Sequence, residues 1–162
     1  MSNQSKEFLL KYGSKKHLDN FVNDDNYRVR KKVAENGHKE HLDKLVNDPS
    51  EYVQSTVAEH GQKDHLDKLV NHPDYEVRKK VASHGSKEHH NKLINDEHYG
   101  VRSMVAKHGS KEHLDKLVND KNYEVRSVVA QYGHKEHLHK LIDDPHKDIR
   151  AIALKRLKEL NK

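Results

Sequence analysis

Residues 110–133 read SKEHLDKLVNDKNYEVRSVVAQYG, and most of this stretch recurs along the chain at intervals of 24 residues. The glycine that ends it has counterparts at the same spacing, with no insertion between them: Gly13, Gly37, Gly61, Gly85, Gly109 and Gly133. A histidine keeps the same spacing: His17, His41, His65, His89, His113 and His137. Self-similarity at a period of about 20–50 residues is typical of solenoid proteins, in which each repeat packs on its neighbours.

Each repeat is predicted to form two short helices. The first begins after a position held by Ser14, His38, Gln62, Ser86, Ser110 or His134, and it buries apolar residues spaced i, i+3, i+4, such as Leu42, Leu45 and Val46. An Asn-Asp pair then predicts an aspartate N-cap for the second helix, with a proline at its first position. In the second repeat this helix is expected over residues 49–59, ending at a glycine in the left-handed C′ conformation.

The predicted fold is all-α, a right-handed α-solenoid of about six two-helix repeats that forms one domain over residues 1–162. Residues 1–13 are predicted to be an N-terminal capping helix, and residues 14–133 five full repeats. Residues 134–162 are a sixth repeat with a longer capping helix, because Leu157 stands where the next glycine would fall.

The sequence YEVRKKVASHG at residues 75–85 and its copies follow the pattern D-x-x-Y-x-V-R-x-x-V-A, which resembles HEAT-like repeats. The 24-residue length resembles the variant leucine-rich repeats. The resemblance covers nearly the whole chain from about residue 14. It implies that the second helices line a concave face and that Asp and Arg residues join neighbouring copies. Some variant leucine-rich proteins carry a cysteine-ligated iron–sulfur segment, and this chain has no cysteine, so no redox role is expected.

Composition narrows the possible functions. The absence of cysteine excludes disulfides, thiolate catalysis and thiolate zinc sites. We find no nucleophile motif and no glycine-rich phosphate loop, so we expect neither an enzyme nor a cofactor or small-molecule substrate. No apolar run is long enough for a signal peptide or a membrane span, which predicts a cytoplasmic protein without membrane contact.

Positions that vary between copies are free to serve a partner, and many of them lie on one arc of the second helices. We call this arc the variable strip and predict that it binds a protein, which would make the chain an adaptor or an occluding inhibitor. Its partner-binding residues are predicted to be Arg28, Lys31, Lys32, Tyr52, Ser55, Thr56, Glu76, Lys79, Lys80, Ser103, Met104, Lys107, Ser127 and Val128. Val128 is open to the alternative that it only extends the core, and Met104 is balanced between the two.

The alternative function is binding of a nucleic-acid backbone by the basic part of this strip. A net charge of +5 permits it. Acidic residues on the same strip and the scarcity of aromatic residues for base stacking argue against it. The acidic residues are Glu35, Glu59, Glu76 and Glu124.

Three repeated features are expected to be structural. The first is the arginine series Arg30, Arg78, Arg102, Arg126 and Arg150. Each arginine follows an Asp, or in one copy His72, by six positions, and in one repeat Gln54 replaces the arginine. The second is a set of i, i+4 pairs on the first helices, which include Lys39–Asp43, Lys63–Asp67, Lys111–Asp115, Glu40–Lys44, Asp64–Lys68, Glu88–Lys92 and Glu112–Lys116.

The third is the histidine series. We expect these side chains to pack and hydrogen-bond between repeats rather than to bind metal, since a structural zinc site needs four ligands and no thiolate is present. A pH- or metal-responsive role stays open as a weaker alternative. If the histidines are buried and neutral, their pKa is lowered and the fold weakens in mild acid.

Overall fold

The computed structural model describes residues 3–161, which form thirteen α-helices and no strand within that range. These helices group into two compact units, the first ending at His84 and the second beginning at Gly85. The first unit contains α1 (Asn3–Tyr12), α2 (Lys15–Leu18), α3 (Tyr27–Glu35), α4 (Lys39–Leu45), α5 (Glu51–His60), α6 (Lys63–Leu69) and α7 (Tyr75–His84). The second contains α8 (Lys87–Leu93), α9 (Tyr99–His108), α10 (Lys111–Leu117), α11 (Tyr123–Tyr132), α12 (Lys135–Leu141) and α13 (Lys147–Leu160).

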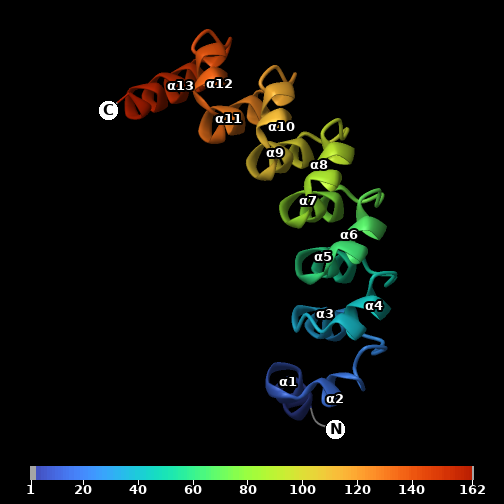
Figure 1. Ribbon diagram of the computed structural model, residues 1–162. Coiled ribbons are helices and arrows are strands. Elements are labelled where there is room, and N and C mark those ends of the chain that lie inside the picture. The colour runs from blue at the N-terminus through green and yellow to red at the C-terminus, as the bar shows by residue number, and fades with distance from the viewer. Residues whose placement is uncertain (1–2, 162) are drawn as a thin grey trace. The chain divides into compact units, whose positions relative to one another are not determined.

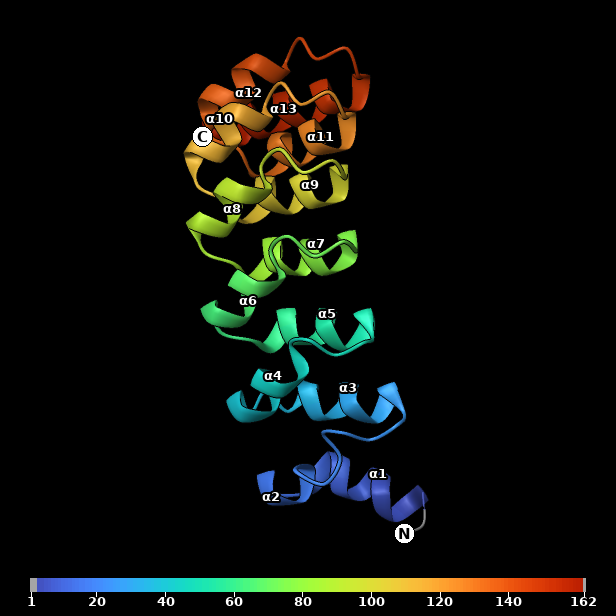
Figure 2. The ribbon, with the colours of Figure 1, turned by 90° about the vertical axis from the view of Figure 1, so that its right-hand side faces the viewer.

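Within each unit the helices form two layers (Figure 1). In the first unit the long helices α3, α5 and α7 pack on one another in that order, and the short helices α4 and α6 lie beside them (Figure 2). In the second unit α9, α11 and α13 form the long-helix layer, and α8, α10 and α12 form the short-helix layer. The chain is therefore an α-solenoid with two helices per repeat, as the sequence predicts, and the structure makes one of them longer than the other.

The core lies between the two layers of each unit. Leu42 and Leu45 of α4 and its C-cap residue Val46 are almost completely buried, as predicted, and so are Val53 and Val57 of α5, the long helix that contacts α4. Each fully buried aliphatic side chain of this kind stabilises the fold by about 1.5–3 kcal/mol. The i, i+3, i+4 spacing of these residues places them on one face of each helix, which fixes the packing of the two layers.

The long helices begin two residues later than the sequence predicts. The first residue of α5 is Glu51 and its N-cap is Ser50, so the prediction of Asp48 as N-cap and Pro49 as first helical residue was wrong. Asp48 instead accepts a hydrogen bond from the Ser50 amide at 2.9 Å and binds Arg30 with the same carboxylate. An Asx turn before the helix satisfies that amide, and the carboxylate remains in reach of the neighbouring repeat.

The left-handed glycine at the end of each long helix is confirmed only for Gly37, whose φ is +68°. Gly61, Gly109 and Gly133 have φ of −78°, −76° and −70°, so for them the prediction was wrong. Glycine is favoured at these three positions because a Cβ atom would clash with neighbouring atoms. A Cβ at Gly109 would lie 2.5 Å from the Val105 carbonyl oxygen and 3.0 Å from the Cβ of His113.

Two glycine substitutions separate these two causes. Gly109→Ala is expected to destabilise the fold by about 1–3 kcal/mol, because its contacts are backbone and the first side-chain atoms of a buried histidine. Gly37→Ala meets nothing within 4 Å, so its cost of about 1–2 kcal/mol comes from the positive φ alone. Replacing each with asparagine distinguishes them in urea denaturation. Asparagine tolerates positive φ and should recover stability at residue 37 but not at residue 109; recovery at both would contradict the account.

Candidate interaction surface

The arginine series is structural, as the sequence predicts. Arg102 binds Asp120 through two hydrogen bonds, Nε to Oδ2 at 2.7 Å and Nη2 to Oδ1 at 2.8 Å. Its third nitrogen donates to the carbonyl oxygen of Asp96 at 2.8 Å. Burial raises the pKa of Asp120, but hydrogen bonds from Arg102 and the Asn122 amide outweigh it and hold that pKa below its usual value. The same pairing joins Arg30 to Asp48 and Arg126 to Asp144.

One repeat replaces this ion pair with a neutral pair. Gln54 stands at the arginine position and His72 at the aspartate position. The two side chains meet, with His72 Nε2 and Gln54 Oε1 2.7 Å apart. Both replacements were recognised from the sequence, but their pairing was not predicted. The signal for the pairing is their separation of 18 residues, which is the same as that between Arg30 and Asp48.

The histidine series links neighbouring short helices, and its predicted structural role is confirmed. Nε2 of His137 donates to Asp115 at 3.0 Å, and Nδ1 accepts the amide hydrogen of His134, the N-cap residue, at 2.9 Å. Burial lowers the pKa of His137, although Asp115 acts in the opposite direction. Equivalent inter-repeat contacts are His41–Asp19, His65–Asp43 and His113–Asn91.

The acidic partners on the short helices differ from those predicted. Lys39–Asp43 and Lys111–Asp115 form as expected, at 2.9 and 3.1 Å. Glu40, however, binds Lys15 of the preceding repeat at 2.6 Å, and Glu112 binds Lys87 at 3.2 Å. Within the described residues, four predicted pairs were wrong, because their lysines contact no carboxylate: Lys44, Lys68, Lys92 and Lys116. Lys140, at the same repeat position, likewise contacts no carboxylate there.

One group of side chains has the composition of a metal site but is already neutralised. The ligand atoms of Asp43, Asp64 and His65 all lie within 4.8 Å of one another. The Lys39 ammonium contacts both carboxylates, at 2.9 and 3.2 Å. Nδ1 of His65 accepts the Gln62 amide hydrogen at 2.9 Å, and its Nε2 contacts Asp43. A metal ion would have to displace the lysine and break these hydrogen bonds, so this group serves the repeat contact.

Four residues of the variable strip come together in the first unit. Arg28, Lys31, Lys32 and Tyr52 line a hollow of about 330 Å³ between α3 and α5. Tyr27 and Glu35 complete its lining, and we call it the α3–α5 hollow. The rings of Tyr27 and Tyr52 stack with centroids 5.5 Å apart, and the Arg28 guanidinium lies 5.8 Å from the Tyr27 ring.

Positive charge exceeds negative charge at the α3–α5 hollow. Three cationic side chains face one carboxylate, Glu35, which contacts Lys32 at 2.6 Å and Lys31 at 3.6 Å. Further along the strip the charges cancel, since Lys79 contacts Glu76 at 3.3 Å and Lys80 contacts Glu59 at 2.7 Å. The hollow is therefore the part of the strip where a cationic excess meets the exposed ring of Tyr52 and the half-buried ring of Tyr27.

A second, larger hollow of about 800 Å³ adjoins it between α1 and α3. It shares Arg28, Lys32 and Glu35 with the α3–α5 hollow, and Leu10 and Val29 add apolar surface to it. This larger hollow was not predicted from the sequence, because the N-terminal helix was interpreted only as a cap on the core.

Two predicted strip residues are buried. Thr56 is 5% exposed and donates its hydroxyl hydrogen to the Tyr52 carbonyl oxygen at 2.9 Å, and Ser103 is 7% exposed. These two residues therefore belong to the packed side of their helices rather than to a contact surface. Ser55 is half-buried, while Tyr52 on the same helix is 58% exposed.

The remaining strip residues belong to the second unit, on α9 and α11. Met104 and Val128 are half-buried, so each packs in part against its neighbours and is in part accessible to a partner. Lys107 is exposed, with its ammonium 5.8 Å from the Tyr132 ring. Ser127 is half-buried and accepts a hydrogen bond from Gln131 at 3.4 Å.

Exposed tyrosines are the feature that the sequence analysis missed. Tyr27 is half-buried, but its counterparts Tyr75, Tyr99 and Tyr123 are 39%, 37% and 49% exposed. Each is the first residue of its long helix, where the adjacent helix no longer covers it. The recurring D-x-x-Y pattern was the available signal.

Comparisons with known proteins bear on the fold. No protein-family model matches the chain, and no curated protein shows significant similarity to it. A solved structure described as "a leucine-rich repeat variant with a novel repetitive protein structural motif" aligns with 94% of this chain and 80% of its own, at 23% identity and a TM-score of 0.62. An engineered protein and a designed armadillo repeat protein align with TM-scores of 0.46 and 0.37, at 14% and 17% identity. They cover 99% of this chain and 97% and 87% of their own.

The chain therefore has the helical-repeat fold of the leucine-rich repeat variant, while membership of the HEAT-like family stays a prediction. No helix between residues 3 and 161 combines the length and apolar character needed to cross a bilayer.

Proposed function

We propose that this chain acts by binding a protein partner rather than by catalysis, as an adaptor or an occluding inhibitor. The α3–α5 hollow is the anchoring point. The observation that carries the proposal is the meeting there of two stacked tyrosines, the half-buried Tyr27 and the exposed Tyr52, with three cationic side chains and a single carboxylate. Tyrosine and arginine are enriched among the residues that dominate binding energy, since they combine apolar area with hydrogen-bond donors.

The chemistry of the hollow favours an acidic partner segment with an apolar side chain. Carboxylates of such a segment would meet Arg28 and Lys31, and the apolar group would pack on the ring of Tyr52. The volume of about 330 Å³ is suited to one or two side chains rather than to a whole element, and the larger hollow beside it offers room for the rest of the segment.

The test is a selection of random peptides on the full chain, followed by affinity measurement of the enriched sequences by fluorescence anisotropy. We expect acidic sequences to be enriched. The double variant R28E/K31E is expected to weaken their binding at least about tenfold, since it removes two cations and adds two repulsive charges. Its unfolding free energy should stay within about 0.5 kcal/mol of the parent value, because both residues lie at the surface.

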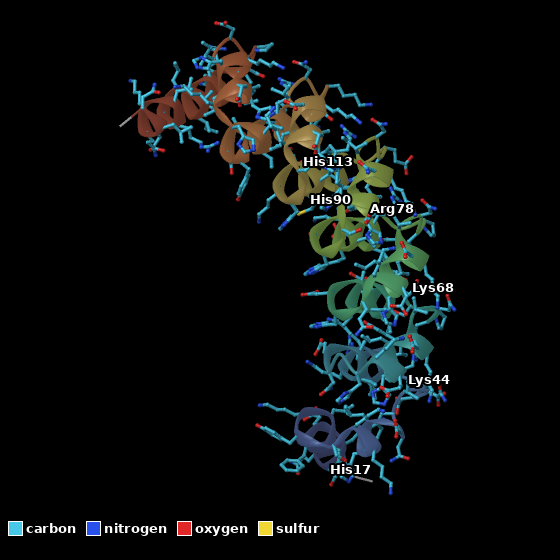
Figure 3. The ribbon with its side chains drawn as sticks, viewed as in Figure 1. His17, Lys44, Lys68, Arg78, His90 and His113 are labelled. Atoms are coloured by element: carbon cyan, nitrogen blue, oxygen red, sulfur yellow. The ribbon has the colours of Figure 1, made fainter. Side chains whose placement is uncertain are left out.

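The matched control is K44E/K68E, which makes the same change in charge in the same unit. Lys44 and Lys68 belong to the short helices α4 and α6, and within the described residues neither contacts a carboxylate (Figure 3). Affinity should change far less than in R28E/K31E. Equal losses in the two variants would mean that only net charge matters, and enrichment of neutral or basic peptides would overturn the assignment.

The nucleic-acid alternative is tested with labelled duplex and single-stranded DNA at about 50 and 200 mM salt. The ion pairs Lys79–Glu76 and Lys80–Glu59 reduce the positive charge that a phosphate backbone would need, so we expect no tight binding. Micromolar affinity that falls steeply with salt would favour nucleic acid over protein.

A further inference from the structure

The short helix α8 departs from the repeat at two adjacent positions. It reads KEHHNKL where α10 reads KEHLDKL. His90 replaces a leucine, and Asn91 replaces an aspartate. His90 is 5% exposed, so an imidazole occupies a core position that holds a buried leucine in the neighbouring copies.

Both changes act on the same neighbour, His113 of α10. His113 is 1% exposed, and its Nδ1 accepts the Ser110 amide hydrogen at 2.9 Å. Its Nε2 lies 3.0 Å from Oδ1 of Asn91. Because a backbone amide can only donate and an amide oxygen can only accept, His113 is neutral and carries its hydrogen on Nε2. The His90 ring packs edge-on against it, with centroids 5.5 Å apart (Figure 3).

A positive charge on His113 has less compensation than one on His41, His65 or His137. The equivalent His41 and His137 face Asp19 and Asp115, whose carboxylates stabilise a cationic ring. At His113 that place is taken by the neutral amide of Asn91. Burial, followed by the charge of His90, lowers the pKa of His113.

The other charged groups around His113 do not remove this penalty. The positive charges of Lys87 on α8 and Lys116 on α10 also lower the pKa of His113, and the carboxylate of Glu112 acts in the opposite direction. On the long helices packed against α10, Arg102 is held by Asp120 and Arg126 by Asp144. His108, which ends α9 just before the N-cap Ser110, is a further titratable group at this turn.

We propose that the contact between α8 and α10 is an acid-sensitive contact of the second unit, which loosens locally when the buried ring of His113 is protonated beside His90. A proton on Nδ1 of His113 removes the acceptor of the Ser110 amide, which is the N-cap of α10, and places a cation beside His90 in the core. The N-terminus of α10 then separates from α8 before the rest of the unit unfolds.

The direction of the pH effect follows from the lowered pKa of His113. The unfolded or opened state takes up a proton near the usual histidine pKa of about 6.5, while the closed state does not. Stability of this contact is therefore present above about pH 6.5 and is lost as the pH falls below it.

The test is amide hydrogen exchange by NMR on the full chain, at pH 7.5 and 5.5, with each rate divided by the intrinsic rate at the same pH. Below about pH 6.5 the protection of the Ser110 amide is expected to fall by up to about tenfold per pH unit, the limit for one proton. The amide of His134, whose acceptor His137 faces a carboxylate, should lose less protection and serves as the internal reference.

Variants taken from the chain's own repeats make the test specific. N91D and H90L each restore the residue found in α10, so both are expected to fold and to reduce the loss of protection at Ser110 in acid. D115N makes the opposite change and should increase the loss at His134. Equal pH dependence of the two amides in the parent chain, or an unchanged response in both N91D and H90L, would overturn the proposal.

Discussion

Replacing Asp120 with alanine is expected to lower the free energy of unfolding by about 3–5 kcal/mol, the range for removing one partner of a buried ion pair. The side chains of Arg102 and Asp120 are only 6% and 7% exposed, so the guanidinium would lose two hydrogen bonds without gaining water in their place. Urea denaturation followed by circular dichroism measures the loss. A loss below about 1 kcal/mol, typical of surface pairs, would contradict the account.

The chain itself supplies a matched control for this prediction. The double variant R102Q/D120H transfers the neutral pair seen at Gln54 and His72, where the side chains are 2.7 Å apart. It is expected to be more stable than D120A, although it changes two residues, since no buried charge is left without a partner. If the double variant is as unstable as D120A or less stable, the two pairs are not interchangeable and the common role is refuted.

The second large effect is expected for His137→Ala, at about 2–5 kcal/mol. The imidazole is completely buried, and its loss leaves a cavity, an unsatisfied amide at His134 and an Asp115 carboxylate that keeps only its contact with Lys111. Thermal or urea denaturation of the full chain measures this loss.

His17→Ala is the matched control, because His17 occupies the same repeat position but is exposed. Its Nδ1 accepts the Ser14 amide hydrogen at 3.1 Å and lies 2.9 Å from the Ser14 hydroxyl, and both contacts are open to water. We expect a loss of no more than about 1.5 kcal/mol. Equal losses at residues 17 and 137 would show that burial and the inter-repeat contact are unimportant.

The architecture could be predicted because every copy repeats the same local signals. Glycine, the N-cap position and the apolar spacing of Leu42 and Leu45 agree on helix positions, and an exact period allows no alternative register. Predictions failed where one residue serves two partners. The spacing of Asp48 to the second helix indicated a cap, but the same carboxylate binds Arg30 of the preceding repeat.

The candidate site was only partly predictable for the same physical reason. Helical angles identified Arg28 and Lys31 correctly as surface residues. The angles cannot show, however, which residues a neighbouring helix buries. Thr56 was therefore predicted to contact the partner, whereas the structure buries it and bonds its hydroxyl to the Tyr52 carbonyl oxygen. The i, i+4 rule likewise considers one helix alone, and Lys15 of the preceding repeat competes for Glu40.

The most direct test of the central claim is to follow the amide shifts of the full chain by NMR while adding the tightest selected peptide. The account predicts that the largest changes lie at Tyr27, Arg28, Lys31 and Tyr52, around the α3–α5 hollow, and that the changes disappear in R28E/K31E. Changes confined to the short helices α4 and α6, or to the second unit, would contradict it.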